Sequence, residues 1–451
     1  MACGGRGWFR GRRACLSTNL TPPTPPWYHD PEMLRIAYHT LGCKVNQYET
    51  EKMREAMEGA GFGTVPFSHA ADVYIINTCS VTHVADGKSR AAIRRAIRQN
   101  PKAYVVVAGC YADLEPGRVR AIEGVDLVVP HSEKEAIPER LIARFGNPKS
   151  QIPNPKSLVR PRLRTRAVVK VQDGCDQFCA YCVIPYARSG KTSRPIESVL
   201  DELAVLGEFG YREIVLAGIR LGSYHDGKTR LPELIAKAAQ IDGISRIRLS
   251  SIEPWEVDDA LLNVITLPKV CRHLHIPLQS GDDGVLGRMG RPYGASEYRR
   301  VVEMVRERVP GIGITTDVIV GFPGEDDAAF ANTRAMIEDM DFSRLHVFRY
   351  SPRNRTKAAA MPDQVSDHEK KIRAQKLLEL GKLGMARFAA SQVGRVLDVL
   401  VESGSGPYKY LRGFADNYVE VRLPGDASLR GEIVRVEITG TEGGVCTGVG
   451  S

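Results

Sequence analysis

Short apolar runs alternate with amphipathic segments through the first part of the chain. Segments 46–60 and 84–99 carry apolar residues at helical spacing, and the runs around them have the length and β-branched content of strands. These runs are RIAYH (35–39), DVYIIN (72–77), AYVVVAG (103–109) and DLVV (126–129). Because such alternation is typical of a parallel sheet covered by helices, residues 34–146 are predicted to form an α/β domain.

A second alternating region begins at residue 167. Its apolar runs are AVVKVQ (167–172), EIVLAG (213–218), RIRLSS (246–251), HLHIPL (273–278), GITTDVIVGF (313–322) and RLHVFRY (344–350). About six βα units predict a complete or partial TIM-like barrel over residues 167–391, with its chemistry at the C-terminal ends of the strands. The segment 147–166, rich in Asn, Pro and Arg, is interpreted as a linker.

Residues 392–451 have a different pattern. Alternating β-type runs such as RVLDVLVES and YVEVRL are divided by Gly-rich turns, which is typical of a small β-barrel. A chain of 451 residues is too long for one hydrophobic core. The predicted fold class is α/β, with a parallel-sheet domain, a central barrel and a C-terminal β-barrel.

Residues 1–33 do not resemble part of a domain, because they are rich in Arg, Gly and Pro and hold no acid before Asp30. We expect a disordered tail or a misassigned upstream start, with Met33 as the alternative start; an organellar presequence is a further alternative. Cys3 and Cys15 are set aside with this segment.

The cysteine content and the hydropathy indicate the compartment. Ten cysteines in this length are too sparse for a disulfide scaffold, and no secretory signal peptide opens the sequence. No apolar run approaches the roughly 18 residues that a membrane-spanning helix needs. We expect a soluble, cytoplasmic protein with no membrane partner.

Basic residues exceed acidic ones by 62 to 53, and the excess is concentrated. Windows 88–102, 156–170, 343–357 and 369–387 hold strings of Lys and Arg with few acids. These windows are either solvated helix faces or a nucleic-acid surface. The tail 393–451, with six basic and eight acidic residues, does not share the excess.

Three cysteines, Cys175, Cys179 and Cys182, occupy a C-x3-C-x2-C spacing in the loop after the first barrel strand. Three thiolates can hold three irons of a 4Fe-4S cluster and leave the fourth iron open. A structural zinc site needs four ligands, and no fourth Cys or His lies nearby in sequence. A disulfide would leave one thiol over. The spacing therefore favours a cluster.

This motif, with an aromatic residue directly before its last Cys, resembles the radical S-adenosylmethionine (SAM) superfamily. The resemblance implies that SAM chelates the open iron and is cleaved to a 5′-deoxyadenosyl radical. It also implies SAM contacts, which are Tyr181 on the adenine, Gly218 along the methionine, Ser251 and Glu253 at the ribose or ammonium, and Arg188 and Arg194 at the carboxylate. For the four polar residues, an ordinary salt-bridge or loop role is the alternative.

Three further cysteines follow three strands of the first domain: Cys43, Cys79 and Cys110. The C-terminal ends of parallel strands share one edge of the sheet, where ligands usually bind. The three thiols are therefore expected to converge, although each alone is typical of a buried structural cysteine. Convergence would make them a second cluster site.

Their contexts, LGCKVNQYETE, NTCSVT and VAGCYA, resemble the N-terminal domain of the methylthiotransferases, in which three such cysteines carry an auxiliary 4Fe-4S cluster. Motifs such as HLHIPLQSGDDGVLGRMGRPY extend the resemblance from about residue 35 to the C-terminus, where GFADNYVEVRL resembles the RNA-binding TRAM module. The resemblance implies two 4Fe-4S clusters, SAM, an electron donor such as flavodoxin or ferredoxin, and a sulfur donor. In the TRAM-like segment, Phe414 and Tyr418 are interpreted as core residues, with base stacking as the alternative.

The LGCKVNQYETE stretch is most similar to the MtaB-like branch, which modifies N6-threonylcarbamoyladenosine in tRNA. The alternatives are isopentenyladenosine in tRNA, a ribosomal-protein aspartate, or a non-enzymatic iron-sulfur RNA-binding protein. One segment, FRYSPRNRTKAAAMP (348–362), departs from an expected FPYSPRPGTPAA-like pattern by losing Pro and Gly and gaining Arg. We expect this change to redirect the loop.

Overall fold

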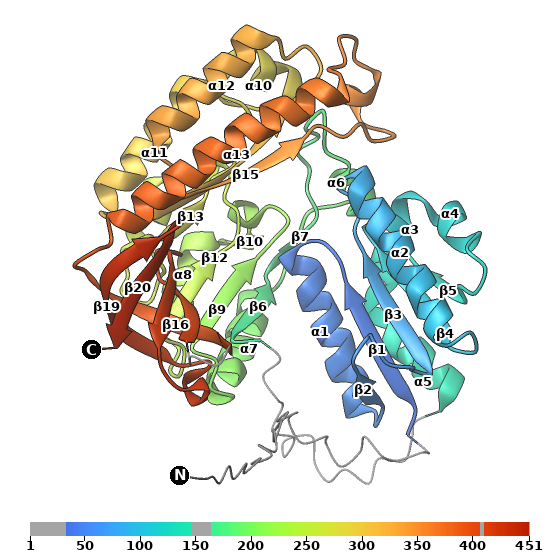
Figure 1. The fold of residues 1–451 in the computed structure, drawn as a ribbon. Coiled ribbons are helices and arrows are strands. Elements are labelled where there is room, and N and C mark those ends of the chain that lie inside the picture. The colour runs from blue at the N-terminus through green and yellow to red at the C-terminus, as the bar shows by residue number, and fades with distance from the viewer. Residues whose placement is uncertain (1–32, 147–163, 406–409, 451) are drawn as a thin grey trace, which may run out of the picture.

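The computed structural model describes residues 33–146, 164–405 and 410–450. All but the last residue of the predicted tail 1–33, and most of the linker 147–166, lie outside these described residues. Figure 1 shows an N-terminal α/β domain beside a larger strand-and-helix domain, with a small β-barrel at the C-terminal end. Within the described residues, no helix has the length and apolar character needed to cross a membrane.

The N-terminal domain is built on a parallel sheet of five strands in the order β2-β1-β3-β4-β5. The strands are β1 (Arg35–Thr40), β2 (Gly63–Val65), β3 (Val73–Thr78), β4 (Tyr104–Gly109) and β5 (Leu127–Val129). The sequence predicted four of them and missed β2, because three residues are too few to show a period.

Helices cover both faces of this sheet. They are α1 (Lys44–Gly59), α2 (His83–Gln99), α3 (Cys110–Leu114), α4 (Pro116–Arg120) and α5 (Ile137–Phe145). One core packs α1 and α5 on the sheet, and the other packs α2 with α3 and α4. The chain reverses direction across the sheet between β1 and β3, and ligands of such sheets bind beside this reversal, at the C-terminal strand ends.

The central domain is a partial barrel of six parallel strands, as the alternating pattern predicted. The strands are β6 (Arg166–Lys170), β9 (Glu213–Ala217), β12 (Arg246–Leu249), β13 (His273–His275), β14 (Gly313–Val320) and β15 (Arg344–Arg349). They form two three-stranded sheets, β12-β9-β6 and β13-β14-β15. Single bridges, including Ser251 to His275, join the two halves.

Amphipathic helices pack against the outer face of this partial barrel. They are α7 (Ile196–Glu208), α8 (Leu231–Ala238), α9 (Asp259–Ile265), α10 (Asp283–Met289), α11 (Ala295–Arg308), α12 (Asp327–Met340) and α13 (Asp367–Ala390). The basic window 369–387 lies within α13, which crosses the domain in Figure 1 and leads into the last module.

The C-terminal module is a closed barrel in the order β16-β17-β18-β20-β19. Its strands are β16 (Val396–Ser405), β17 (Tyr410–Ala415), β18 (Glu420–Pro424), β19 (Ile433–Glu442) and β20 (Val445–Gly450). The Phe414 ring stacks on the Tyr418 ring with centroids 5.1 Å apart, and Arg248 lies over Tyr418. Both rings therefore pack at the joint with the central domain, outside the apolar core of the small barrel where the sequence analysis expected them.

A buried carboxylate anchors this joint. Glu213, fully buried on β9, pairs with Arg248 at 2.7 Å and Arg246 at 2.6 Å. The two arginines also donate to backbone carbonyl oxygens of the C-terminal barrel, including those of Phe414 and Asp416. Burial raises the pKa of the Glu213 carboxyl, but Arg248 and Arg246 outweigh it and lower the pKa to about 2.

Glu213→Gln is expected to destabilise the chain by about 3 kcal/mol, because it leaves buried guanidinium groups without a counter-charge. Urea unfolding near neutral pH measures the loss. Since the folded-state pKa lies below the ordinary value of 4.5, the wild-type advantage should shrink as the pH falls from 4.5 toward 2.

The matched control is Glu338→Gln, which removes an exposed partner of Arg334 on α12. An exposed pair of this kind contributes at most about 0.5 kcal/mol. Equal stabilities of the two variants would contradict the anchoring role of Glu213.

Candidate metal centres

The structure brings Cys43, Cys79 and Cys110 to one edge of the N-terminal sheet. They follow the three adjacent strands β1, β3 and β4, and Cys43 and Cys79 flank the reversal point described above. Burial raises the pKa of the Cys79 thiol to about 11, and the neighbouring thiols of Cys110 and Cys43 contribute to the rise. The three thiols thus lie at the C-terminal ends of adjacent strands, on one edge of the sheet.

The surroundings of Cys110 suit an anionic group. Burial raises the pKa of its thiol, while the cations Arg188 and Lys134 act in the opposite direction and favour the thiolate. The Arg188 Nε atom is buried and lacks a hydrogen-bond partner among the described residues. Thiolates bound to iron would supply the negative charge that these cations face, so the residues present fit a cluster here.

Arg188 lies in a buried network of charged side chains at the domain interface. Its guanidinium group pairs with Glu49 at 2.9 Å and Asp173 at 2.7 Å, and donates to Asn46 Oδ1 at 2.6 Å. Two of these partners belong to α1 and one to the central domain. Arg188 thus joins the two domains beside Cys110, and its expected contact with the SAM carboxylate stays a prediction.

Arg194 also joins these domains. It pairs with Glu202 on α7 at 2.6 Å and donates to the Tyr48 hydroxyl of α1 at 2.9 Å. Both arginines that the sequence analysis assigned to the carboxylate of SAM are thus engaged by protein groups, because α1 packs against the start of the central barrel.

The second set of thiols, Cys175, Cys179 and Cys182, lies in the loop after β7 (Gln172–Asp173), directly beyond β6. Gly174 begins the loop at φ +72°, and a Cβ atom there would lie 1.6 Å from the Gly190 carbonyl oxygen. Only glycine permits this approach. Burial raises the pKa of the Cys182 thiol to about 12, and Cys179 and Cys175 add to the rise.

Arg291, which sequence reasoning missed, links this loop to Glu253. Its Nη1 atom donates to Cys179 Sγ at 3.3 Å, and its Nη2 atom pairs with the Glu253 carboxylate. A guanidinium donor on a buried sulfur favours a thiolate, so this set also fits a bound cluster. Arg291 belongs to the GRMGRPY motif that carried the family resemblance, but the spacing of the motif does not indicate a contact with a cysteine sulfur.

The remaining predicted SAM residues lie around the same loop. Tyr181 packs against the apolar cluster that contains Met289 and Phe322. A Cβ atom on Gly218 would lie 2.9 Å from Gln172 Oε1, so the position admits only glycine. Ser251 forms the bridge between the two half-barrels, and its neighbour Ser250 accepts a hydrogen bond from the Gly218 N–H.

The two cysteine sets approach each other across the domain interface. Cys110 belongs to one buried cluster with Leu114 of α3 and with Val183, which directly follows Cys182, and Ala187 of α6 (Ile184–Ala187). In Figure 1, α6 lies against the N-terminal domain beside α2 and α3. The structure therefore places both sets of thiols at one junction.

Among the described residues, two groups of ligand-type side chains have their ligand atoms within 4.8 Å of one another, and neither group contains a cysteine. Asp317 accepts from His275 Nε2 at 3.3 Å and His346 Nδ1 at 3.1 Å, on strands β13, β14 and β15. The second group, Glu49, His131 and Asp173, already faces Lys134, Lys170 and Arg188. The carboxylates of the second group are thus neutralised by protein cations. The side chains of the first group lie on three neighbouring barrel strands and contact one another.

Both domains that carry the cysteine sets match known family models. Residues 35–130 match the model described as Uncharacterized protein family UPF0004, and residues 169–337 match the Radical SAM superfamily. Among solved structures, the radical S-adenosylmethionine methyltransferase TsrM from Kitasatospora setae is similar in fold, with a TM-score of 0.53 and 16% identity over 72% of this chain and 77% of that one.

Curated relatives match nearly the whole chain. Threonylcarbamoyladenosine tRNA methylthiotransferase MtaB from Bacillus subtilis is 38% identical over 90% of this chain and 94% of its own length. The enzyme of the same name from Thermotoga maritima is 38% identical over 91% and 96%. A tRNA-2-methylthio-N(6)-dimethylallyladenosine synthase from Thermodesulfovibrio yellowstonii is 32% identical over 89% and 95%.

These matches confirm the resemblance that the cysteine motifs indicated. Identity of this level spans all three domains and includes the two domains that carry the thiols. The chain belongs to the radical SAM methylthiotransferase family.

Proposed function

We propose that this enzyme adds a methylthio group to C2 of N6-threonylcarbamoyladenosine at position 37 of tRNA, in the cytoplasm. The observation that carries the proposal is the meeting of two cysteine sets at one domain junction. The choice of substrate is supported by four relatives named for threonylcarbamoyladenosine, which are 35–39% identical to this chain. Three relatives named for dimethylallyladenosine are 32–35% identical.

We assign the auxiliary 4Fe-4S cluster to Cys43, Cys79 and Cys110, and the SAM-binding cluster to Cys175, Cys179 and Cys182. When bound, the clusters and SAM supply the sulfur, its methyl group and the radical that activates an inert C–H bond. Arg188 and Lys134 hold positive charge against Cys110, and Arg291 holds Cys179 and Glu253 together. These positive charges stabilise the thiolates that would hold the clusters.

Further contacts belong to the same proposal. Tyr181 and Gly218 are assigned to SAM, together with Ser251 and Glu253. An electron donor such as flavodoxin or ferredoxin and a separate sulfur donor complete the reaction, because the chain supplies neither. The C-terminal barrel is assigned to RNA by its TRAM-like sequence.

Replacing Cys43, Cys79 and Cys110 with Ala is expected to halve the iron content of the anaerobically reconstituted enzyme, from about eight to about four per chain. The SAM-binding cluster should remain, so reductive cleavage of SAM to 5′-deoxyadenosine should persist. Iron analysis and chromatography of the product measure the two quantities.

Cys446→Ala is the matched control, since this buried cysteine lies in the C-terminal barrel and should leave the iron content unchanged. An undiminished iron content in the triple variant would refute the auxiliary site. Absence of 5′-deoxyadenosine formation in the wild type would favour the non-enzymatic alternative.

Deletion of the gene is expected to remove the methylthio form of threonylcarbamoyladenosine from cellular tRNA, because the proposed reaction is the one that adds the methylthio group. Mass spectrometry of tRNA nucleosides measures it. Loss of the methylthio form of isopentenyladenosine would assign the other tRNA substrate. An unchanged nucleoside profile with an unmodified ribosomal-protein aspartate would assign the ribosomal substrate.

A further inference from the structure

One face of α2 carries a row of arginines. Arg90, Arg94 and Arg98 are spaced four residues apart, so their side chains lie above one another along the helix. Like charges at this spacing repel and weaken a helix. In the described part of the chain, no carboxylate lies within 4.0 Å of the Arg94 or Arg98 guanidinium group. Arg94 and Arg98 therefore have no close counter-charge among the described residues.

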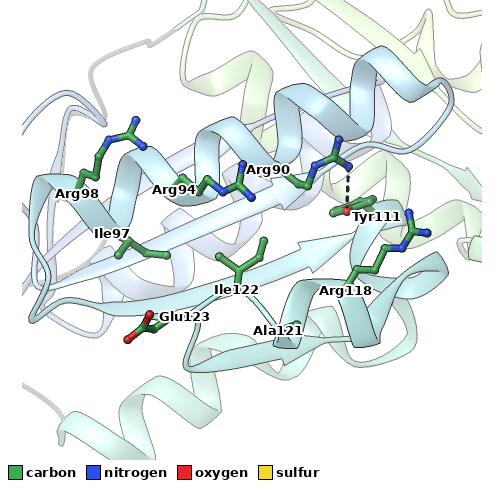
Figure 2. A pocket seen from close by; sticks show the side chains of 9 residues that line it. All are labelled: Arg90, Arg94, Ile97, Arg98, Tyr111, Arg118, Ala121, Ile122 and Glu123. Carbon is green, nitrogen blue, oxygen red and sulfur yellow. Dashed lines mark hydrogen bonds between the residues drawn. The ribbon is translucent and has the colours of Figure 1, made fainter.

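These arginines form one wall of a groove. Figure 2 shows their side chains facing Tyr111, Ile122 and Arg118 from the segment around α4. The groove encloses about 630 Å³, and Glu123 is its sole acidic lining residue among those described. Arg90 donates to the Tyr111 hydroxyl at 3.1 Å, which fixes its position without neutralising it. The groove therefore has four arginines and one carboxylate in its lining, which gives it a net positive charge.

A second cavity, of about 290 Å³, continues this groove toward the central domain. It shares Arg90 and Arg118 with the first cavity and is also lined by Arg353 and Arg355. Its two carboxylates are Asp86 and Glu115, and Glu115 pairs with the largely exposed Arg118 at 3.3 Å. The basic windows 88–102 and 343–357, distant in sequence, thus meet at one surface. Within the second window, Arg353 is buried and paired with Asp86 at 2.6 Å, whereas Arg355 is exposed.

Arg355 adopts a backbone conformation that favours glycine. Its φ is +74°, in the left-handed region that side chains rarely enter. The family-like pattern noted for this loop has Gly at the same place, so the chain carries a charged side chain where glycine would be less strained. Backbone strain of this kind clusters at functional positions, where the side chain binds a ligand or takes part in a reaction.

We propose that Arg90, Arg94, Arg98, Arg118 and Arg355, together the α2 groove, bind the phosphate backbone of the substrate RNA. This inference rests on the proposed function. Arginines at each helical turn, with Arg94 and Arg98 exposed and Arg90 half-buried, suit a chain of phosphates, and an enclosed site would suit a single phosphate ion. The inner end of the groove is Tyr111, directly after Cys110, so RNA bound there is led toward the junction of the two cysteine sets.

The charge of the other domains agrees with this assignment. The segment 393–451 has an excess of acidic residues, so it contributes little to nonspecific attraction for phosphates. The α2 helix holds five Lys and Arg residues and one Asp. The N-terminal domain therefore supplies a larger share of the positive field than the TRAM-like barrel.

The first test removes two groove charges with Arg94→Ala and Arg98→Ala in the full chain carrying both clusters. The probe is a synthetic anticodon stem-loop containing threonylcarbamoyladenosine, titrated over a range of KCl concentrations. The Kd is expected to rise on the order of tenfold, and the slope of log K against log salt to fall by about two. Iron content and SAM cleavage without RNA should stay at the wild-type level.

The matched control is the double variant Arg300→Ala and Arg334→Ala, which removes two exposed arginines from α11 and α12. Its Kd and salt slope should stay close to those of the wild type. Equal values for groove and control variants, with a wild type that binds and modifies the RNA, would overturn the groove alone. A wild type that neither binds nor modifies the RNA would overturn the proposed function as well.

The second test, Arg355→Gly, separates binding from folding. Glycine relieves the positive φ, so the Tm should rise, while the Kd for the stem-loop should rise about threefold with the loss of one contact. Asp363→Gly is the control, because Asp363 also has a positive φ, of +57°, but carries a negative charge. This control should raise the Tm without weakening RNA binding. Unchanged RNA affinity in Arg355→Gly would contradict the role of Arg355.

Discussion

Buried arginines, each paired with a carboxylate, hold the three domains in one arrangement. Arg188 joins α1 to the central domain, Arg353 joins the 348–362 loop to Asp86 on α2, and Arg248 joins β9 to the C-terminal barrel. Separating any of these pairs while it stays buried would leave an uncompensated charge, which costs several kcal/mol. The domain junctions are therefore electrostatically specified, in addition to being packed.

This arrangement fixes the distance between the two cysteine sets. Each set lies on a loop at the C-terminal end of a parallel strand, so neither loop alone determines how it faces the other. Arg188 contacts α1 and Asp173, two residues before Cys175, and also influences Cys110. One side chain thus couples the loop of one set to a thiol of the other.

The sequence predicted those parts of the structure that depend on local period and spacing. Strand ends on a parallel sheet are equivalent by symmetry, so placing Cys43, Cys79 and Cys110 after three strands was enough to expect them at one edge. The six barrel strands and the C-terminal barrel followed from the same kind of pattern. Arg188 and Arg291 were different, because each has a partner more than 100 positions away in the chain, Glu49 for Arg188 and Cys179 for Arg291, which only the packed fold brings close.

The polar lining of the barrel was missed for a related reason. His275, Asp317 and His346 come from three strands, and each looks like one polar residue in an apolar run. Alternation along HLH, TTD and RLH would have shown that they share the inward face, but the register that brings them within hydrogen-bond distance is set by strand pairing.

Two arginines in the altered loop differ in burial, and burial decides whether the charge pairs with the protein or is accessible to a ligand. Arg353 is buried, so it needs the carboxylate of Asp86 and the hydroxyl of Ser80 that it contacts at 2.7 Å. Arg355, two residues later, is exposed, and water stabilises its charge without any protein partner. The first therefore serves the domain junction and is unavailable to a ligand. The second adds its charge to the surface beside α2, at a backbone position that a neutral glycine would occupy with less strain.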